Sequence, residues 1–415
     1  MGWLTREHRQ DRRRDQQRAL EKAIEQAIAR DVSAILIPGD LFDRAGVDTE
    51  MLAFAVLAFE ITGCPPVYIT PGNHDPMAPT SLVWSERLLR TRGFRWPANV
   101  EIFDSPSWTA RPLLGQPVLI WGRCFQSGTA VDERPLSEAS IAAIGPLDPA
   151  YLHVGLFHGS LEGHCPPHQK MVGPFSEDDA LRAPFAYLAV GHYHRRCTSR
   201  PMSVVDASAA IDGNGDGTHT APPSATRWGY AGSAVALDCT ETGLHGALEV
   251  RIEWEANEQR HPEVKSSEVE VVPLDTRRVH ELTVDVSGCA SADQVDRRVL
   301  HALDSAAVSE RDLTRVHLAG RLVRGVRYGG PGVELKERAF HLALDLGGLK
   351  PDYDLESYRI AADETTEGRF ARALLERLEH ESDPRRRATL ERALYYGLDA
   401  FRLGEVQPAY EELAE

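Results

Sequence analysis

Closely spaced cysteines are absent from this chain. Its six cysteines are scattered along 415 residues. Zinc knuckles and disulfide frameworks need short, paired spacings, so the sequence indicates neither kind of site. The chain also lacks an apolar run of membrane-spanning length and a hydrophobic segment behind a basic N-terminus. We therefore expect a cytoplasmic protein.

Positive charge is also scarce. The sequence has 46 basic and 62 acidic residues, which gives a formal net charge of -16. This balance disfavours a protein that holds nucleic acid by bulk electrostatics. Bound divalent ions, or grouped arginines such as Arg195-Arg196, would have to attract an anionic substrate locally. The few lysines are Lys22, Lys170, Lys265, Lys336 and Lys350.

Length and patterning predict several domains around an α/β core. A chain of 415 residues is long for one domain, and 42% hydrophobic residues can bury a sizeable core. After a charged helix over residues 11–30, strands and helices alternate, which is typical of a layered α/β fold. Short strands with Pro and Gly turns follow and predict a second sheet. Strands are predicted at 34–38, 67–70, 101–103, 118–121, 153–157, 187–190, 230–237 and 247–252, and helices at 49–61 and 81–92.

Changes in composition predict three regions. Residues 1–255 form the first domain, and a polar stretch with Pro262 separates it from a small α+β module over residues 265–350. A helical tail covers residues 360–415. Its apolar stripes predict either a hairpin that packs on itself or a docking surface for a partner's helix.

A loop inserted in the first domain, between Thr198 and Arg227, is rich in Ser, Gly, Pro and Asp. Within it, the spacing of Asp, Asn and Gly from Asp212 to Gly217 is similar to the first half of a calcium-binding loop. The twelfth position of that loop is Pro223 instead of the required Glu, which favours a plain turn.

Polar motifs follow four of the predicted buried strands. They are Gly39-Asp40, Gly72-Asn73-His74-Asp75, His158 and Gly191-His192-Tyr193-His194. The carboxyl ends of parallel strands meet in the binding crevice of open α/β sheets. One polar residue at a strand end usually caps a helix or satisfies a turn. A carboxylate, an amide and three histidines at successive strand ends instead predict a metal centre.

This ligand set suits the hydrolysis of phosphate esters. The reaction needs a strong nucleophile and a means to absorb charge on the phosphoryl oxygens, and two divalent ions about 3.5 to 4 Å apart supply both. One carboxylate must bridge the ions, and Asp40 is the candidate. Imidazoles and an amide oxygen favour manganese, iron or zinc over magnesium.

Together with Asp43-Arg44, the four motifs resemble the ordered signature of the calcineurin-like metallophosphoesterases. In order and spacing they are similar to the SbcD-like DNA repair exonucleases, as is the segment from Gly229 to Ser233. The resemblance implies a four-layer α-β-β-α sandwich with a smaller α+β capping domain and a helical C-terminal tail.

The resemblance also implies a role for each metal ligand. Asp40 would bridge two divalent ions, with manganese expected and iron or zinc as alternatives. Asn73, His158 and His192 would complete one site, while His194 would belong to the other.

Three further residues receive roles in the same way. His74 would lie near the leaving oxygen as general acid or transition-state stabiliser, and Asp75 would orient it. Asp43 would support the metal ligands or begin a helix.

The sequence departs from the family pattern at its start. Family members open with a strand that ends in Asp-x-His, whose side chains bind the same ion as His194, and this chain has no such motif. Either the start codon was assigned late, or the chain is a truncated relative with one weakened site. The first explanation is favoured, because His74 and His194 make little sense without a second ion.

Three functional hypotheses remain. The resemblance implies a manganese-dependent DNA exonuclease or endonuclease that works with an SbcC-like coiled-coil ATPase, and it suggests a homodimer. The acidic charge and scarce lysines are compatible with a phosphodiesterase or phosphatase for small molecules. The missing first motif supports a scaffold that has lost catalysis and only binds the ATPase.

Overall fold

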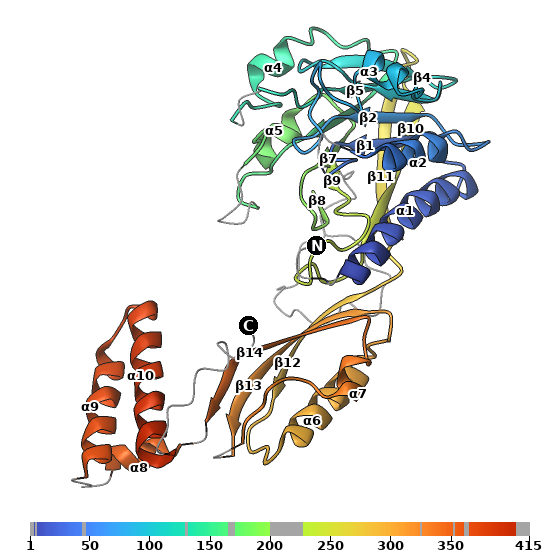
Figure 1. Cartoon of the computed structure of the whole chain (residues 1–415). Coiled ribbons are helices and arrows are strands. Elements are labelled where there is room, and N and C mark those ends of the chain that lie inside the picture. The colour runs from blue at the N-terminus through green and yellow to red at the C-terminus, as the bar shows by residue number, and fades with distance from the viewer. Residues whose placement is uncertain are drawn as a thin grey trace. The chain divides into compact units, whose positions relative to one another are not determined.

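The computed structural model divides the chain into two compact units (Figure 1). The first comprises mainly Thr5–Leu237 and Gly243–Thr276, and the second mainly Asp238–Thr242 and Arg277–Glu415. The structure describes residues 4, 6–43, 47–128, 132–164, 171–199, 227–323, 326–351, 353–360 and 365–403. Arg44 and most of the loop predicted between Thr198 and Arg227, including its calcium-like segment, lie outside these residues.

The first unit begins with a small parallel sheet flanked by helices. The elements are α1 (Arg6–Ala29), β1 (Ile35–Pro38), α2 (Thr49–Phe59), β2 (Val67–Thr70), α3 (Glu86–Thr91) and β3 (Val100–Ile102). The sheet has the order β1-β2-β3. Ile35 and Ile37 pack with Leu52 and Phe59 of α2, whereas Leu36 belongs to a second core. This alternation shows that β1 contacts a different layer on each face.

A six-stranded sheet follows, with the order β4-β5-β6-β7-β9-β8. Its strands β5, β6, β7 and β9 are parallel, and the edge strands β4 and β8 are antiparallel to their neighbours. The elements are β4 (Thr109–Leu113), β5 (Val118–Gly122), α4 (Glu138–Ala142), β6 (Leu152–His158), α5 (Glu177–Arg182), β7 (Tyr187–Gly191), β8 (Cys197–Thr198) and β9 (Trp228–Tyr230). Strand β1 packs against β6 and β7, so the two sheets lie against each other.

Two predicted elements differ from the structure. The strand expected at residues 230–237 ends at Tyr230, because Gly232 has a φ of 79°, which an extended strand cannot contain. The helix expected at residues 81–92 begins only at Glu86. Ser81 instead uses its hydroxyl to accept the backbone N–H of Trp84 at 3.2 Å, which stabilises a turn.

A long antiparallel hairpin completes the first unit. It consists of β10 (Gly246–Ala256) and β11 (Pro262–Pro273). Val250, Ile252 and Val264 pack against the core that contains Tyr68 of β2. The polar stretch that we expected to end the first domain is therefore the turn and part of the second strand of this hairpin. An exposed hairpin tip has the same polar composition as a linker, so composition did not distinguish them.

The second unit contains a parallel sheet of order β12-β13-β14 and a group of helices. Its elements are β12 (Val279–Asp285), α6 (Ala292–Ser305), β13 (Leu313–Leu322), α7 (Val333–Lys336), β14 (His341–Pro351), α8 (Leu355–Ile360), α9 (Thr366–His380) and α10 (Pro384–Leu403). Leu374 and Leu378 of α9 pack with Leu394 and Leu398 of α10. The apolar stripes of the tail thus bury each other in a hairpin (Figure 1). No helix in the described part of the chain is long and apolar enough to cross a membrane.

Candidate metal centre

Four strand ends converge at one place in the first unit. Asp40 follows β1 and Asn73 follows β2, which is parallel to β1. His158 is the last residue of β6, and its register partner on β7 is Gly191, directly before His192. Because β1 packs against β6 and β7, the ends of both sheets meet.

The polar atoms of these residues are in mutual contact. Nε2 of His158 lies 2.8 Å from Oδ1 of Asn73 and 3.3 Å from Oδ2 of Asp40. Nδ1 of His192 lies 3.2 Å from the same Asn73 oxygen and 3.3 Å from Nε2 of His158. The ligand atoms of Asp40, His158 and His192 all lie within 4.8 Å of one another.

The protonation of His158 shows why this cluster fits a cation. Its Nδ1 lies 2.9 Å from the carbonyl oxygen of Pro38, which can only accept, so Nδ1 carries the proton. In the neutral ring Nε2 then presents a lone pair to the Asp40 and Asn73 oxygens. A metal ion, or a further proton on Nε2, would satisfy this lone pair and the oxygens that face it. A carboxylate, an amide and two imidazoles form a donor set suited to manganese, iron or zinc.

The electrostatics of the cluster favour a neutral His192 ring and an ionised Asp40 carboxylate. Burial, together with nearby His158, lowers the pKa of His192 to about 4, so its ring is neutral at pH 7. Burial alone would raise the pKa of Asp40, but its interaction with His158 and the backbone amide of His74 hold that pKa below its ordinary value. Metal ligation needs neutral imidazoles and an ionised carboxylate, which His192 and Asp40 provide. Burial alone would lower the pKa of His158, but its contacts with Asp40 raise that pKa above the ordinary value, so metal binding would displace a proton from this ring.

Close backbone approach explains two of the glycines in the motifs. A Cβ atom on Gly191 would lie 1.9 Å from the carbonyl oxygen of Pro38, and one on Gly72 would lie 2.2 Å from Oδ1 of Asp40. Both distances are far below contact. Asp40 and His192 themselves have φ angles of 55° and 123°, which are uncommon for residues other than glycine. Such strain persists where the surrounding structure holds a functional site in place.

Asp75 joins the loops that carry the ligands. Its side chain is fully buried and accepts the backbone N–H groups of Gly72 at 2.7 Å and of Asp40 and Phe42 at 3.2 Å each. Burial raises the pKa of Asp75 to about 7, against the opposing effect of the Gly72 amide. We expected Asp75 to orient His74, but these contacts of its carboxylate go to the backbone. The buried carboxylate therefore connects the backbones of the two ligand loops.

His74 lies at the rim of the cluster with its ring half exposed. Its backbone N–H donates to Oδ1 of Asp40 at 2.9 Å. Its Nδ1 lies 3.2 Å from the carbonyl oxygen of Asp43 and 3.6 Å from a carboxylate oxygen of that residue. Asp43, and not Asp75, is thus the acid beside the His74 ring.

His194 stands outside the group formed by Asp40, His158 and His192, although its charge contributes to lowering the pKa of His192. Ser233 holds its backbone, because the Ser233 N–H and hydroxyl lie 2.9 and 3.4 Å from the His194 carbonyl oxygen. The hydroxyl also lies 2.9 Å from Nδ1 of buried His245. The sequence singled out the segment that contains Ser233 but assigned it no role.

Comparison with known proteins agrees with this geometry. Residues 8–196 match the calcineurin-like phosphoesterase family, and this range contains every residue of the cluster. Over 195 residues the chain is 30% identical to YhaO of Bacillus subtilis (strain 168), an uncharacterized metallophosphoesterase. The matched region covers 45% of this chain and 42% of that relative, so the chain spans less than half of the relative's length. These matches make residues 8–196 similar to a metallophosphoesterase domain, in agreement with the donor set of the cluster.

Proposed function

From this similarity, we propose that the protein is a metal-dependent phosphodiester hydrolase that cleaves DNA as an exonuclease or endonuclease of DNA repair. The convergence of Asp40, Asn73, His158 and His192 at the ends of strands from two sheets carries the proposal. The order of the motifs, which is similar to that of SbcD-like exonucleases, supports DNA as the substrate. The second unit and helical hairpin beyond the matched region also support it, since enzymes for small phosphodiesters can end soon after the last histidine motif.

The ligands would be divided between two divalent ions. Asn73, His158 and His192 would hold one ion, His194 would hold the other, and Asp40 would bridge them. When bound, such ions polarise the phosphoryl group and lower the pKa of a nucleophilic water.

The remaining residues would act on the substrate. His74, half exposed at the rim, would donate a proton to the leaving oxygen, and Asp43 would orient its ring. Asp75 would keep the two ligand loops in register through its contacts with three backbone amides.

Further features belong to the same proposal. The two packed sheets, with α2 in one outer core and α5 in another, support the four-layer α-β-β-α arrangement. We also propose manganese as the native metal, an SbcC-like ATPase as partner, a homodimer and a cytoplasmic location. The helical hairpin of α9 and α10 is the candidate element for binding the partner.

The acidic net charge of -16 favours a second candidate, a phosphodiesterase or phosphatase for small molecules. A strongly negative surface repels a polyanion more than it repels a small ester. A scaffold without catalysis is the third candidate, and it would keep the partner while losing hydrolysis.

One assay separates the three candidates. The purified chain is incubated with linear DNA or with bis(p-nitrophenyl) phosphate, with and without manganese. We expect DNA degradation that needs manganese and that falls at least about 100-fold in Asp40→Asn and His192→Ala. Asp178→Asn on α5 and His301→Ala on α6 are matched controls on exposed helix faces. Hydrolysis of the small ester with DNA untouched would favour the second candidate, and inactivity on both would favour the scaffold.

A further inference from the structure

Arg123 lies at the same sheet edge as the metal ligands. It directly follows β5, whose parallel neighbour β6 ends in His158. Its backbone N–H donates to the carbonyl oxygen of Leu156 at 3.4 Å, so the pairing of the two strands continues to this point. Arg123 therefore occupies a strand-end position equivalent to those of the ligands, although the sequence motifs do not include it.

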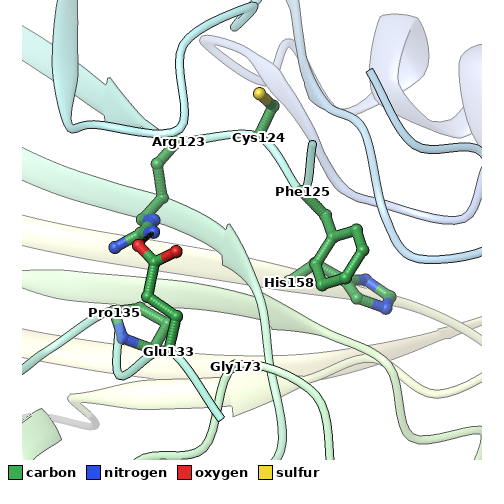
Figure 2. Close-up of a pocket in the computed structure, with 7 residues that line it drawn as sticks. All are labelled: Arg123, Cys124, Phe125, Glu133, Pro135, His158 and Gly173. Carbon is green, nitrogen blue, oxygen red and sulfur yellow. Dashed lines mark hydrogen bonds and ion pairs between the residues drawn. The ribbon is translucent and has the colours of Figure 1, made fainter. Parts of the chain in front are cut away.

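A small pocket lies between Arg123 and His158. Its lining also includes Phe125, Glu133 and Pro135. Figure 2 shows the Arg123 guanidinium facing the Glu133 carboxylate on one side of the pocket, with His158 and Phe125 on the other. The pocket thus has a cation on the side opposite a residue of the candidate metal centre.

The charge of Arg123 is buried, whereas its partner is open to solvent. The Arg123 side chain is 7% exposed, and it donates to the Ser140 hydroxyl at 3.2 Å and to the Glu133 carboxylate. A buried guanidinium requires an anion, and Glu133 supplies one. The Glu133 side chain is 44% exposed, so solvent reaches the position that the anion occupies.

A phosphate can replace the carboxylate in this position. Guanidinium groups bind carboxylate and phosphate with the same paired hydrogen bonds. Ser140 accepts from Nη1 of Arg123, whereas Glu133 accepts from Nη2, so the contact with Ser140 can remain when the anion changes. In a chain with a net charge of -16, a buried arginine beside the metal ligands is also a local source of attraction for a polyanion.

We propose that Arg123 binds a phosphate adjacent to the one being cleaved. When no substrate is bound, Glu133 forms the ion pair with Arg123 in its place. The proposal rests on the proposed hydrolase function and deepens it. It assigns the site to substrates with at least two neighbouring phosphates, as in an oligonucleotide.

Binding experiments test the subsite without depending on hydrolysis. Calorimetry measures the affinity of the full-length protein for the dinucleotide TpT with and without a terminal phosphate, at the 5′ end and at the 3′ end. We expect one added phosphate to strengthen binding at least about tenfold, which is the effect of one hydrogen bond to a charged group. Arg123→Ala should remove this gain, while Glu133→Gln should strengthen binding of the phosphorylated dinucleotide severalfold because the competing anion is lost.

Kinetic measurements extend the test. Arg123→Ala should raise KM for the phosphorylated dinucleotide but leave KM for plain TpT almost unchanged. The ratio of variant to wild-type KM should be about tenfold larger for the phosphorylated substrate. Melting temperature and metal content show whether each variant is folded and loaded. Because Glu133→Gln leaves the buried guanidinium without its anion, Arg123→Lys is the variant that tests the proposal if either of the others fails to fold. It keeps the charge beside Glu133 and should lose part of the gain from the terminal phosphate.

Two results would overturn the subsite. One is an unchanged gain from the terminal phosphate in Arg123→Ala, and the other is weaker binding in Glu133→Gln. Failure of the proposed hydrolase function would give another result. Phosphorylated TpT would then still bind through Arg123, but the protein would not hydrolyse it.

Discussion

Nε2 of His158 lies 3.3 Å from a carboxylate oxygen of Asp40, although His158 ends β6 and Asp40 follows β1, which belongs to the other sheet. This contact joins the two sheets at the candidate metal centre. Loss of either side chain should therefore weaken metal binding and the contact between the two sheets.

Metal addition should stabilise the protein through this pair. A ligand that binds only the folded state at 100 times its Kd contributes about 2.7 kcal/mol. We expect manganese to raise the Tm of chelator-treated wild-type protein, and His158→Ala to lose at least half of that rise. Thermal denaturation with and without manganese measures it, with His301→Ala as the control. An equal rise in His158→Ala would contradict the assigned ligand set.

Loss of the Asp75 carboxylate should destabilise the first unit. Asp75→Ala leaves three backbone N–H groups, those of Gly72, Asp40 and Phe42, without their acceptor. Each buried unsatisfied donor costs about 1–3 kcal/mol, so a loss of at least about 3 kcal/mol is expected in urea denaturation. Asp43→Asn is the matched comparison, because the Asp43 side chain is 91% exposed. That variant should keep its stability to within about 0.5 kcal/mol and lower kcat instead. A small effect of Asp75→Ala would mean that water or a shifted loop replaces the carboxylate.

Ser233 should influence the second ion through the backbone of His194. Ser233→Ala removes the hydroxyl that lies between the His194 carbonyl and His245, while the stronger backbone contact at 2.9 Å remains. We expect a severalfold loss of affinity for the second manganese ion and little change for the first, as measured by calorimetry. Ser233→Thr, which keeps the hydroxyl, should restore the affinity. Equal weakening of both ions would indicate a general structural role.

The stability of the second unit should depend on pH through His317. Both its ring nitrogens lie 2.8 Å from a carboxylate oxygen, Nε2 from Glu281 and Nδ1 from Asp345, so each neighbour favours the charged ring. The contact with Glu281, helped by that with Asp345, raises the pKa of His317, although burial and nearby Arg315 oppose this. The ion pairs of charged His317 therefore contribute fully to the free energy of unfolding below the ordinary histidine pKa of about 6.5. This contribution is lost as the pH rises through the higher pKa that His317 has in the folded protein.

Urea denaturation between pH 5 and 9 measures this dependence. His317→Gln should reduce the loss of stability across the range that begins near pH 6.5. A variant with the same pH profile as the wild-type protein would show that the imidazolium clamp across β12, β13 and β14 contributes nothing measurable.

Buried strands and amphipathic helices could be predicted because local patterns control them. The run Val67–Thr70 is buried at every position and forms the predicted strand β2. The stripes of Leu374, Leu378, Leu394 and Leu398 likewise formed the two predicted tail helices. Strand β14 was missed, because the runs of leucine, alanine and glycine in His341–Pro351 lack a clear strand pattern.

Contacts between distant side chains were harder to predict. The resemblance implied that Asp75 orients His74, and it gave Asp43 only a role in supporting the metal ligands or beginning a helix. The structure turns Asp75 toward three backbone amides and leaves Asp43 beside the His74 ring. Arg123 was missed for the same reason, since a single arginine after a strand carries no motif.

The order of residues along the chain was enough to establish which strands are buried and which polar side chains follow them, because burial and chain direction are local properties. Which of those side chains touch depended on how the two sheets pack and on loops held in strained conformations at Asp40 and His192. Packing brings together groups that are far apart in sequence, and hydrogen bonds then choose their partners by geometry. The acid beside His74 and the pocket at Arg123 are therefore properties of the folded protein.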